Sequence, residues 1–334
     1  MKWIFQKRYN YKNLFFVLSC LLLTFLAGCS SEKPAASSAQ GYSVTDEFGY
    51  KLQFSEKPKR ILGTTGNIEE VLIELIPPDR IVAISEQNLN REYSLIADKA
   101  AKVKKVIPDR ASIETIIAQH PDLVFMQIRS NQAMAETLSE MGIKVFRMKT
   151  PVTLEAIRNR IRDMSIAVGE PERGKELLKE LDAKIALVKK HTGKIPKEKR
   201  KTVIGYTSLG ASGSATGVFR QICEEAGVIN GGAATGIVHF EKISDEQIIK
   251  VNPDIFVVTD EGVENEYGKA LARKILADEA LKDVKAVANK RFIYLKSRYK
   301  YSNSQHFGDA VTLIARGAYP ELFEDEKDAS VKVQ

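Results

Sequence analysis

The stretch SIETIIAQHPDLVF, residues 112–125, recurs as SDEQIIKVNPDIFV at residues 244–257. Serine, glutamate, an isoleucine pair, proline and aspartate stand at the same offsets in both copies, 132 residues apart. Each copy predicts a short helix, then a proline where the helix ends, then an apolar strand. A pattern that recurs at such a distance indicates two similar structural units.

A second pair of segments supports this duplication. KRILGTT at residues 59–65 is matched by KTVIGYT at residues 201–207, 142 residues further on. Both matches occur in the same order and at nearly the same spacing, so we expect two lobes with related folds.

Short apolar segments alternate with amphipathic ones around the first copy. The strands that we expect there are residues 60–65, 80–84, 122–127 and 143–148, and the helices are residues 67–76, 112–119, 131–141 and 153–168. Such alternation predicts parallel βαβ units and an α/β fold of two Rossmann-like lobes. Ahead of them, residues 44–52 contain two β-prone arms around a glycine and predict a hairpin.

A long helix is predicted between the lobes. Pro171 suits a first helical turn, and an apolar face repeats at helical spacing to about His191. Twenty residues span roughly 30 Å, the width of a small domain. The expected organisation is a signal peptide (1–28), a tether (29–41), an N-terminal α/β lobe (42–169), a bridging helix (170–194) and a C-terminal α/β lobe (195–326).

The N-terminus has the layout of a secretory signal. Four cations precede an apolar run from residue 14 to residue 28, which is shorter than a membrane-spanning helix requires. LAGC at residues 26–29 resembles a bacterial lipobox. That resemblance implies cleavage before Cys29 and a lipid on the new N-terminal cysteine, so we expect an extracytoplasmic, membrane-anchored protein.

Composition excludes two classes of protein. Removing the four cations of residues 1–28 lowers the net charge from +7 to +3, which gives no basis for nucleic-acid binding. Beyond the signal and Cys29, the chain has one cysteine, Cys223, so no disulfide framework is expected. A 44% share of hydrophobic residues suits ordinary globular lobes.

Ligands of open α/β sheets bind beyond the carboxyl ends of the strands. We therefore expect a ligand cleft between the lobes, formed by the loops at those ends. The loops are residues 64–67, 85–91, 127–130, 207–214, 238–240, 259–261 and 296–301.

The sequence combines the lipobox, the hairpin, the duplicated βα segments, the bridging helix, EEAG at 224–227 and AYPELF at 318–323. In this combination the chain resembles the substrate-binding lipoproteins of ABC importers. The class is the one that binds ferric siderophores, cobalamin and haem. The resemblance implies a monomer with a stiff linker that binds its ligand, delivers it to a permease and catalyses no reaction. It also implies one exposed docking glutamate in each lobe, here Glu70 and Glu224.

Basic and aromatic residues are well supplied on the expected cleft loops. Guanidinium groups suit the oxygens of an anionic iron chelate, and aromatic faces suit its rim. We expect a ferric siderophore as the ligand, with cobalamin as the main alternative. The ligand-binding candidates are Arg91, Arg129, Tyr206, His239, Phe240, Arg298 and Tyr299.

The four histidines do not predict a metal centre, because His239 is the one that falls on an expected cleft loop. His239 leaves haem open as a ligand. Neither a resident cofactor nor a resident metal is expected. The rival classes are an exported enzyme, for which no nucleophile motif is present, and an adhesion protein on the same fold.

Overall fold

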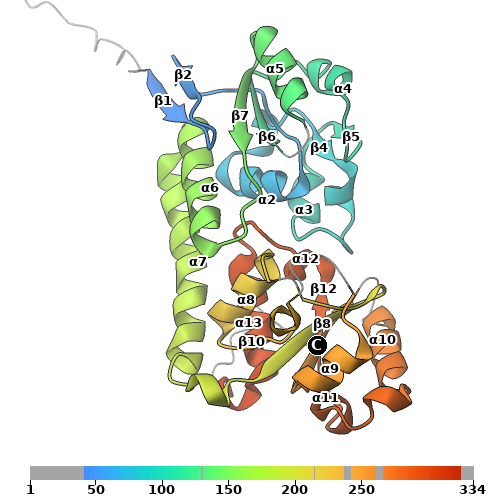
Figure 1. The fold of residues 1–334 in the computed structure, drawn as a ribbon. Coiled ribbons are helices and arrows are strands. Elements are labelled where there is room, and N and C mark those ends of the chain that lie inside the picture. Colours follow the sequence, from blue (N-terminus) through green and yellow to red (C-terminus); the bar gives the residue numbers. More distant parts are fainter. Residues whose placement is uncertain (1–40, 129–130, 214, 237–241, 261–265, 325–334) are drawn as a thin grey trace, which may run out of the picture. The chain divides into compact units, whose positions relative to one another are not determined.

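The N-terminal lobe, residues 42–169, is built on parallel strands as predicted (Figure 1). The computed structural model describes residues 41–128, 131–213, 215–236, 242–260 and 266–324. The main sheet has the order β3-β6-β7, formed by Ile61–Gly63, Leu123–Gln127 and Lys144–Met148. Two short parallel strands lie beside it, β4 (Ile84–Ser85) and β5 (Val106–Ile107). The helices of this lobe are α2 (Gly66–Leu75), α3 (Ala97–Ala100), α4 (Ile113–Ile117), α5 (Gln132–Glu140) and α6 (Leu154–Ala167).

The strand expected at residues 80–84 is wrong over most of its length. Pro78–Arg80 form a 3₁₀ turn, and β4 begins only at Ile84. Ile81 makes one isolated parallel bridge to Ile61. Proline at the start of the segment favours the turn, and the turn delays entry into the sheet.

The expected N-terminal hairpin is confirmed. β1 (Tyr42–Thr45) and β2 (Lys51–Phe54) pair antiparallel around a turn in which Gly49 has a φ of +87°. The buried Asp46 carboxylate accepts the backbone N–H groups of Phe48 and Tyr50, each at 2.9 Å. It also accepts the N–H group of Arg147 in β7, and this bond ties the hairpin to the lobe.

The C-terminal lobe, residues 195–324, repeats the parallel plan. Its sheet has the order β10-β8-β11-β12, and β9 pairs antiparallel with β8. These strands are Ile229–Asn230, Thr202–Thr207, Ile255–Asp260, Phe292–Lys296 and, for β9, Gly210–Ser212. The helices are α8 (Val218–Ala226), α9 (Asp245–Val251), α10 (Glu266–Leu276), α11 (Lys285–Ala288), α12 (Ser297–Lys300) and α13 (Phe307–Ala318).

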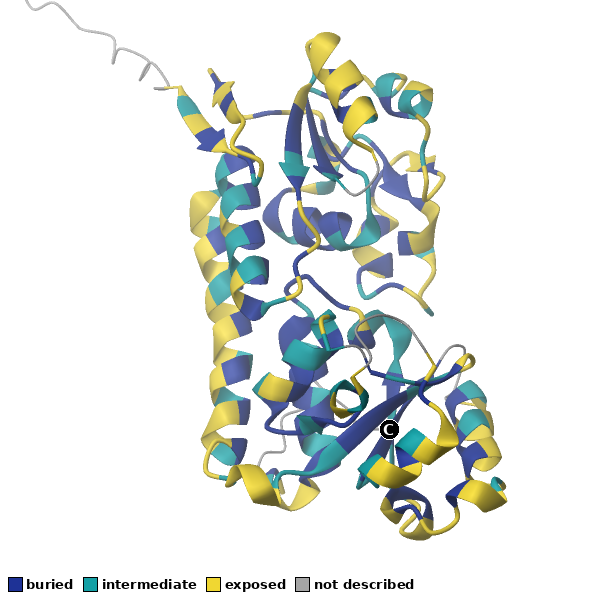
Figure 2. Cartoon of the chain, viewed as in Figure 1, coloured by how far each residue is buried: buried dark blue, intermediate teal, exposed yellow. Residues whose placement is uncertain are grey.

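The bridging helix is α7, Pro171–Thr192, close to the predicted bounds. It packs against α2 and α6 of the first lobe and against α8 and α13 of the second. Its buried apolar face belongs to a core cluster that contains residues of both lobes, and the opposite face is exposed (Figure 2). The helix therefore joins the two lobes through one continuous apolar core.

The α6–α7 packing is close at Gly174. A Cβ atom on this residue would lie 2.2 Å from the Ser165 hydroxyl oxygen, so the position requires glycine. Two further apolar clusters lie on the other faces of the two sheets. Within the described ranges, no helix has the length and apolar character needed to cross a membrane.

Candidate functional site

A large cavity lies at the carboxyl edge of the N-terminal sheet. Its volume is about 980 Å³, and we call it the N-lobe cavity. The cavity is lined by the loops that follow β3, β4, β5 and β6, as expected for an open α/β sheet. Its polar lining comprises Thr64, Thr65, Glu69, Ser85, Gln87, Asp109, Arg110, Ser112, Gln127 and Asn131.

One buried carboxylate positions the wall of this cavity. Glu69 on α2 accepts hydrogen bonds from the Ser85 N–H at 2.9 Å, the Ser85 hydroxyl at 2.5 Å and Asn88 Nδ2 at 2.6 Å. Burial raises the pKa of Glu69 to about 7, while the bonds from Ser85 and Asn88 act in the opposite direction. Glu69 therefore fixes residues 85–88 against the N-terminus of α2.

A smaller pocket of about 300 Å³ is shared by both lobes, and we call it the inter-lobe pocket. It shares the lining residues Thr65, Gly66 and Gln87 with the N-lobe cavity. The C-terminal lobe contributes Ser297, Arg298 and Tyr301 from α12 and the residue after it. The cleft expected between the lobes is therefore present.

The structure places the predicted cations in different roles. Arg298 lines the inter-lobe pocket, and its guanidinium donates to the backbone carbonyls of Arg91 and Ser94. The Arg91 side chain is 80% exposed and pairs with Asp98 at 2.6 Å, so it points to solvent and not into a cavity. Arg129 lies outside the described residues.

The two predicted tyrosines, Tyr206 and Tyr299, line neither the N-lobe cavity nor the inter-lobe pocket. The inter-lobe pocket is lined instead by Tyr93 and Tyr301, which were not among the candidates. Tyr206 packs its ring edge-on against Phe256 in the C-terminal core, and Tyr299 is partly buried against the core shared by both lobes. Desolvation raises the pKa of both tyrosines. His239, Phe240 and Cys29 lie outside the described residues.

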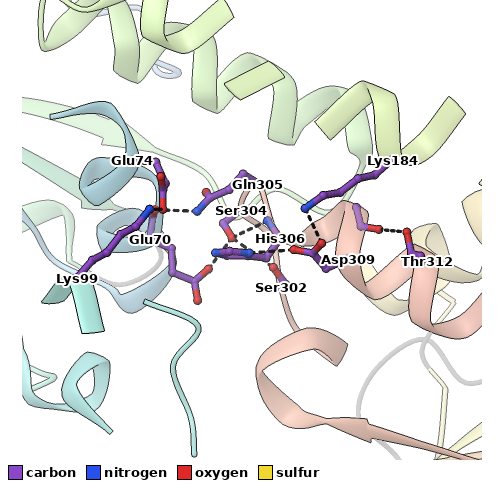
Figure 3. Close-up of polar contacts among 11 residues, drawn as sticks. Glu70, Glu74, Lys99, Lys184, Ser302, Ser304, Gln305, His306, Asp309 and Thr312 are labelled. Atoms are coloured by element: carbon purple, nitrogen blue, oxygen red, sulfur yellow. Dashed lines mark hydrogen bonds and ion pairs between the residues drawn. The ribbon is translucent and has the colours of Figure 1, made fainter. Parts of the chain in front are cut away.

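Glu70 is not exposed, contrary to expectation. The residue is 6% exposed, and its carboxylate accepts a hydrogen bond of 2.5 Å from Ser304 of the other lobe (Figure 3). Gln305 Nε2 donates to the Glu70 carbonyl at 2.8 Å. Burial raises the pKa of Glu70, and nearby His306 opposes that rise. Its neighbour Glu69 is buried as well, because other parts of the chain cover both the face of α2 that carries Glu69 and the face that carries Glu70.

Glu224 is half exposed on α8 and forms an ion pair with Arg220 one turn earlier. A better matched pair of surface carboxylates is Glu114 and Glu246, which occupy the same offset in the two sequence repeats. Both are exposed in the first turn of α4 and α9, after the N-cap residues Ser112 and Ser244. The N-cap hydroxyl and the backbone amide lower the pKa of each glutamate.

Among the residues that the structure describes, no group of three histidine, cysteine or carboxylate side chains is arranged to hold a metal ion. Cys223 is fully buried, and burial raises the pKa of its thiol.

The sequence predicted three of the loops that line the N-lobe cavity, residues 64–67, 85–91 and 127–130, but missed the loop at residues 107–112. Asp109 and Arg110 follow β5, a two-residue strand whose alternation is too short to predict. The position of these two residues could have been inferred, because they come just before the helix that begins after Ser112. A loop that leads from a strand into such a helix lies at the carboxyl edge of the sheet.

Comparison with known proteins agrees with this architecture. A family model for periplasmic binding proteins matches residues 61–299. An uncharacterised ABC transporter substrate-binding lipoprotein of Bacillus subtilis, YvrC, is 23% identical, covering 91% of this chain and 96% of that protein. The petrobactin-binding protein YclQ of the same bacterium is 23% identical, covering 86% of this chain and 91% of that protein.

The molybdate-binding protein MolA of Haemophilus influenzae is 22% identical, covering 91% of this chain and 92% of that protein. Its molybdate-bound structure aligns with a TM-score of 0.69 at 20% identity, covering 86% of this chain and 94% of that chain. The fold class predicted from the sequence is thereby confirmed. The chain belongs to the periplasmic binding protein family and is a substrate-binding protein of the class that serves ABC transporters, not an enzyme.

Proposed function

We propose that this protein captures a ferric siderophore outside the cytoplasmic membrane and delivers it to an ABC permease. The observation that carries the ligand class is the N-lobe cavity, whose volume of about 980 Å³ suits a bulky organic ligand. A small oxyanion such as molybdate would leave most of that volume unfilled. The similarity to the petrobactin-binding YclQ supports an iron chelate.

Charged side chains of both signs line the N-lobe cavity and the inter-lobe pocket, and they bear on the choice among bulky ligands. Arg110 lines the N-lobe cavity and Arg298 lines the adjoining pocket, and both are suited to the oxygens of an anionic chelate. Glu69 and Asp109 also line the cavity, so its lining is not uniformly cationic. A lining of mixed charge also suits a ligand that is less anionic than a ferric siderophore. Cobalamin is therefore the second candidate ligand, within the same transport role.

The test is calorimetric titration of the soluble chain, residues 30–334, with ferric siderophores, their iron-free forms, cobalamin, haemin and molybdate. A 1:1 complex with one ferric chelate but not with its iron-free form is expected. Arg110→Ala is expected to weaken that binding, whereas Arg91→Ala, at an exposed cation outside both cavities, serves as the control. Binding of molybdate alone, or of cobalamin or haemin alone, would refute the siderophore proposal.

Docking on the permease requires exposed carboxylates on both lobes. We assign this role to Glu114 and Glu246 in place of the buried Glu70, with Glu224 as the second candidate in the C-terminal lobe. Helices that precede parallel strands begin at the carboxyl edge of the sheet, so both glutamates lie on the cleft side of their lobes. Exposed ion pairs are typically worth under ~1 kcal/mol each, which suits a complex that must dissociate.

Cellular uptake measurements separate these candidates. The double variant Glu114→Ala/Glu246→Ala is expected to lose uptake while ligand binding stays unchanged. Glu224→Ala is the comparison variant, and loss of uptake only in that variant would transfer the role to Glu224. Unchanged uptake in all of these variants would remove the docking proposal.

Membrane attachment through Cys29 completes the proposal. The lipobox-like LAGC and the similarity to the lipoprotein YvrC support it. Cys29→Ser is expected to release the protein from membranes, as measured by fractionation. A variant that stays on the membrane would contradict lipid anchoring.

A further inference from the structure

The C-terminal lobe reaches the N-terminal lobe through its segment from Lys296 to His306. This segment makes contact at two places that differ in burial and chemistry. We call the first place the pivot, formed by Glu70, Ser304 and Gln305. We call the second place the clasp, formed by Arg298 and Lys296 with the turn Asn90–Ser94.

The pivot is buried and held by a hydrogen bond from Ser304 to the Glu70 carboxyl group. Glu70, Ser304 and Gln305 are each at most 6% exposed. Behind them, His306 Nδ1 lies 3.0 Å from Asp309, and Asp309 pairs with Lys184 of α7 (Figure 3). Opening the pivot breaks hydrogen bonds of a buried carboxyl group, so separating the lobes at this point costs free energy.

The clasp is more open to solvent. The Arg298 guanidinium donates to the Arg91 carbonyl and, at 3.4 Å, to the Ser94 carbonyl. Lys296 Nζ lies 3.8 Å from Asp260 Oδ2 of its own lobe and 4.0 Å from Glu92 Oε2 of the other lobe, and the Lys296 and Glu92 side chains are 25% and 30% exposed. The Lys296–Glu92 ion pair contributes little, because it is partly exposed and screened by salt, so the hydrogen bonds of Arg298 are the main contacts of the clasp.

The turn that the clasp holds is internally tied. The Tyr93 and Ser94 N–H groups both donate to the Asn90 carbonyl, at 3.1 and 2.9 Å. The Glu92 N–H donates to Asn90 Oδ1 at 2.9 Å. The turn therefore presents its carbonyls to Arg298 as one unit, and its Tyr93 lines the inter-lobe pocket.

We infer that Arg298 gates the inter-lobe pocket: the clasp opens to admit ligand while the pivot holds the lobes together. The gating role rests on the proposed function, since it assumes that ligand enters this pocket. Arg298 also has a buried Nε that makes no hydrogen bond. An anionic oxygen of a ligand would offer this guanidinium better acceptors than the two backbone carbonyls do. Ligand and turn thus compete for one side chain.

The test measures lobe separation without any ligand. Spin labels are placed at Lys105→Cys and Arg273→Cys, which are exposed positions on the two lobes, in the full chain with Cys20 and Cys29 replaced by serine. Cys223 is buried and stays unlabelled. Pulsed dipolar spectroscopy then gives the inter-lobe distance distribution.

Arg298→Ala is expected to raise the ratio of open to closed molecules about fivefold, as for the loss of an ordinary hydrogen bond. Arg91→Ala is the matched control, because the clasp uses only the carbonyl of that residue. A thermal melt confirms that each variant is folded. Identical distributions for Arg298→Ala and the parent chain, or equal opening in Arg91→Ala, would overturn the inference. Failure of every ligand to bind would instead refute the proposed function and leave these distances unaffected.

Discussion

Replacing Glu69 with glutamine should change how the stability of this protein depends on pH. In the folded protein the Glu69 carboxylate is buried and accepts three hydrogen bonds from Ser85 and Asn88. Burial is the larger effect, and it raises the pKa of Glu69 from 4.5 to about 7. The folded state therefore holds this proton more tightly than the unfolded chain does.

The size of the effect follows from that difference. Each unit of pKa difference between folded and unfolded states is worth ~1.36 kcal/mol. A raised carboxyl pKa contributes stability that is fully present below pH 4.5 and lost as the pH rises through 7. Between pH 5 and 8.5 the free energy of unfolding should fall by about 2 to 3 kcal/mol relative to Glu69→Gln, which has no proton to lose there.

Urea unfolding of both proteins at half-unit pH steps measures this difference. Glu140→Gln, at an exposed carboxylate on α5, is the control and should follow the parent profile. Glu69→Gln should also weaken ligand binding, because the amide reproduces fewer of the bonds that hold the cavity wall. Parallel stability profiles for the parent chain and Glu69→Gln would refute the reasoning.

Three other substitutions test packing and hydrogen bonding. Gly174→Ala should cost about 1–3 kcal/mol, because the new methyl group would lie 2.2 Å from the Ser165 hydroxyl oxygen; an unchanged urea midpoint would contradict the close α6–α7 packing. Ser304→Ala should cost about 1.5–3 kcal/mol, since it removes a donor from the buried Glu70 carboxylate; a smaller loss would mean that water reaches the pivot. Asp46→Ala should cost about 1–3 kcal/mol and speed hydrogen exchange at the three amides that its carboxylate accepts; amides that stay protected would show that the hairpin turn does not need it.

Much of the fold was predictable because its signals are local. Pro121 and Pro253 each lie between a helix and a strand, as the two repeats predict. Pro171 begins the bridging helix, and Gly49 occupies the left-handed turn of the hairpin. The expected strand at 80–84 is the main error, because Pro78 starts a 3₁₀ turn there.

The site was predictable only by its place in the fold. Arg298 lies at the cleft as expected, but Arg91 points to solvent, and the expected cluster of cations does not form among the described residues. Residue type and order locate a loop at a sheet edge. They do not determine the direction of a long side chain, which its packing neighbours decide.

The sequence by itself determined two α/β lobes, the helix between them and the sheet edge at which the cavity lies. These follow from apolar periodicity, proline positions and an internal repeat, whose signals each lie within a short stretch of chain. Only the tertiary structure decided that Glu70 is buried and that Arg298 holds the other lobe. Each contact joins residues more than 200 positions apart, Glu70 with Ser304 and Arg298 with Arg91, so no local pattern encodes it. Burial of a helical glutamate depends on what packs over its helix, and that is fixed only when the lobes meet.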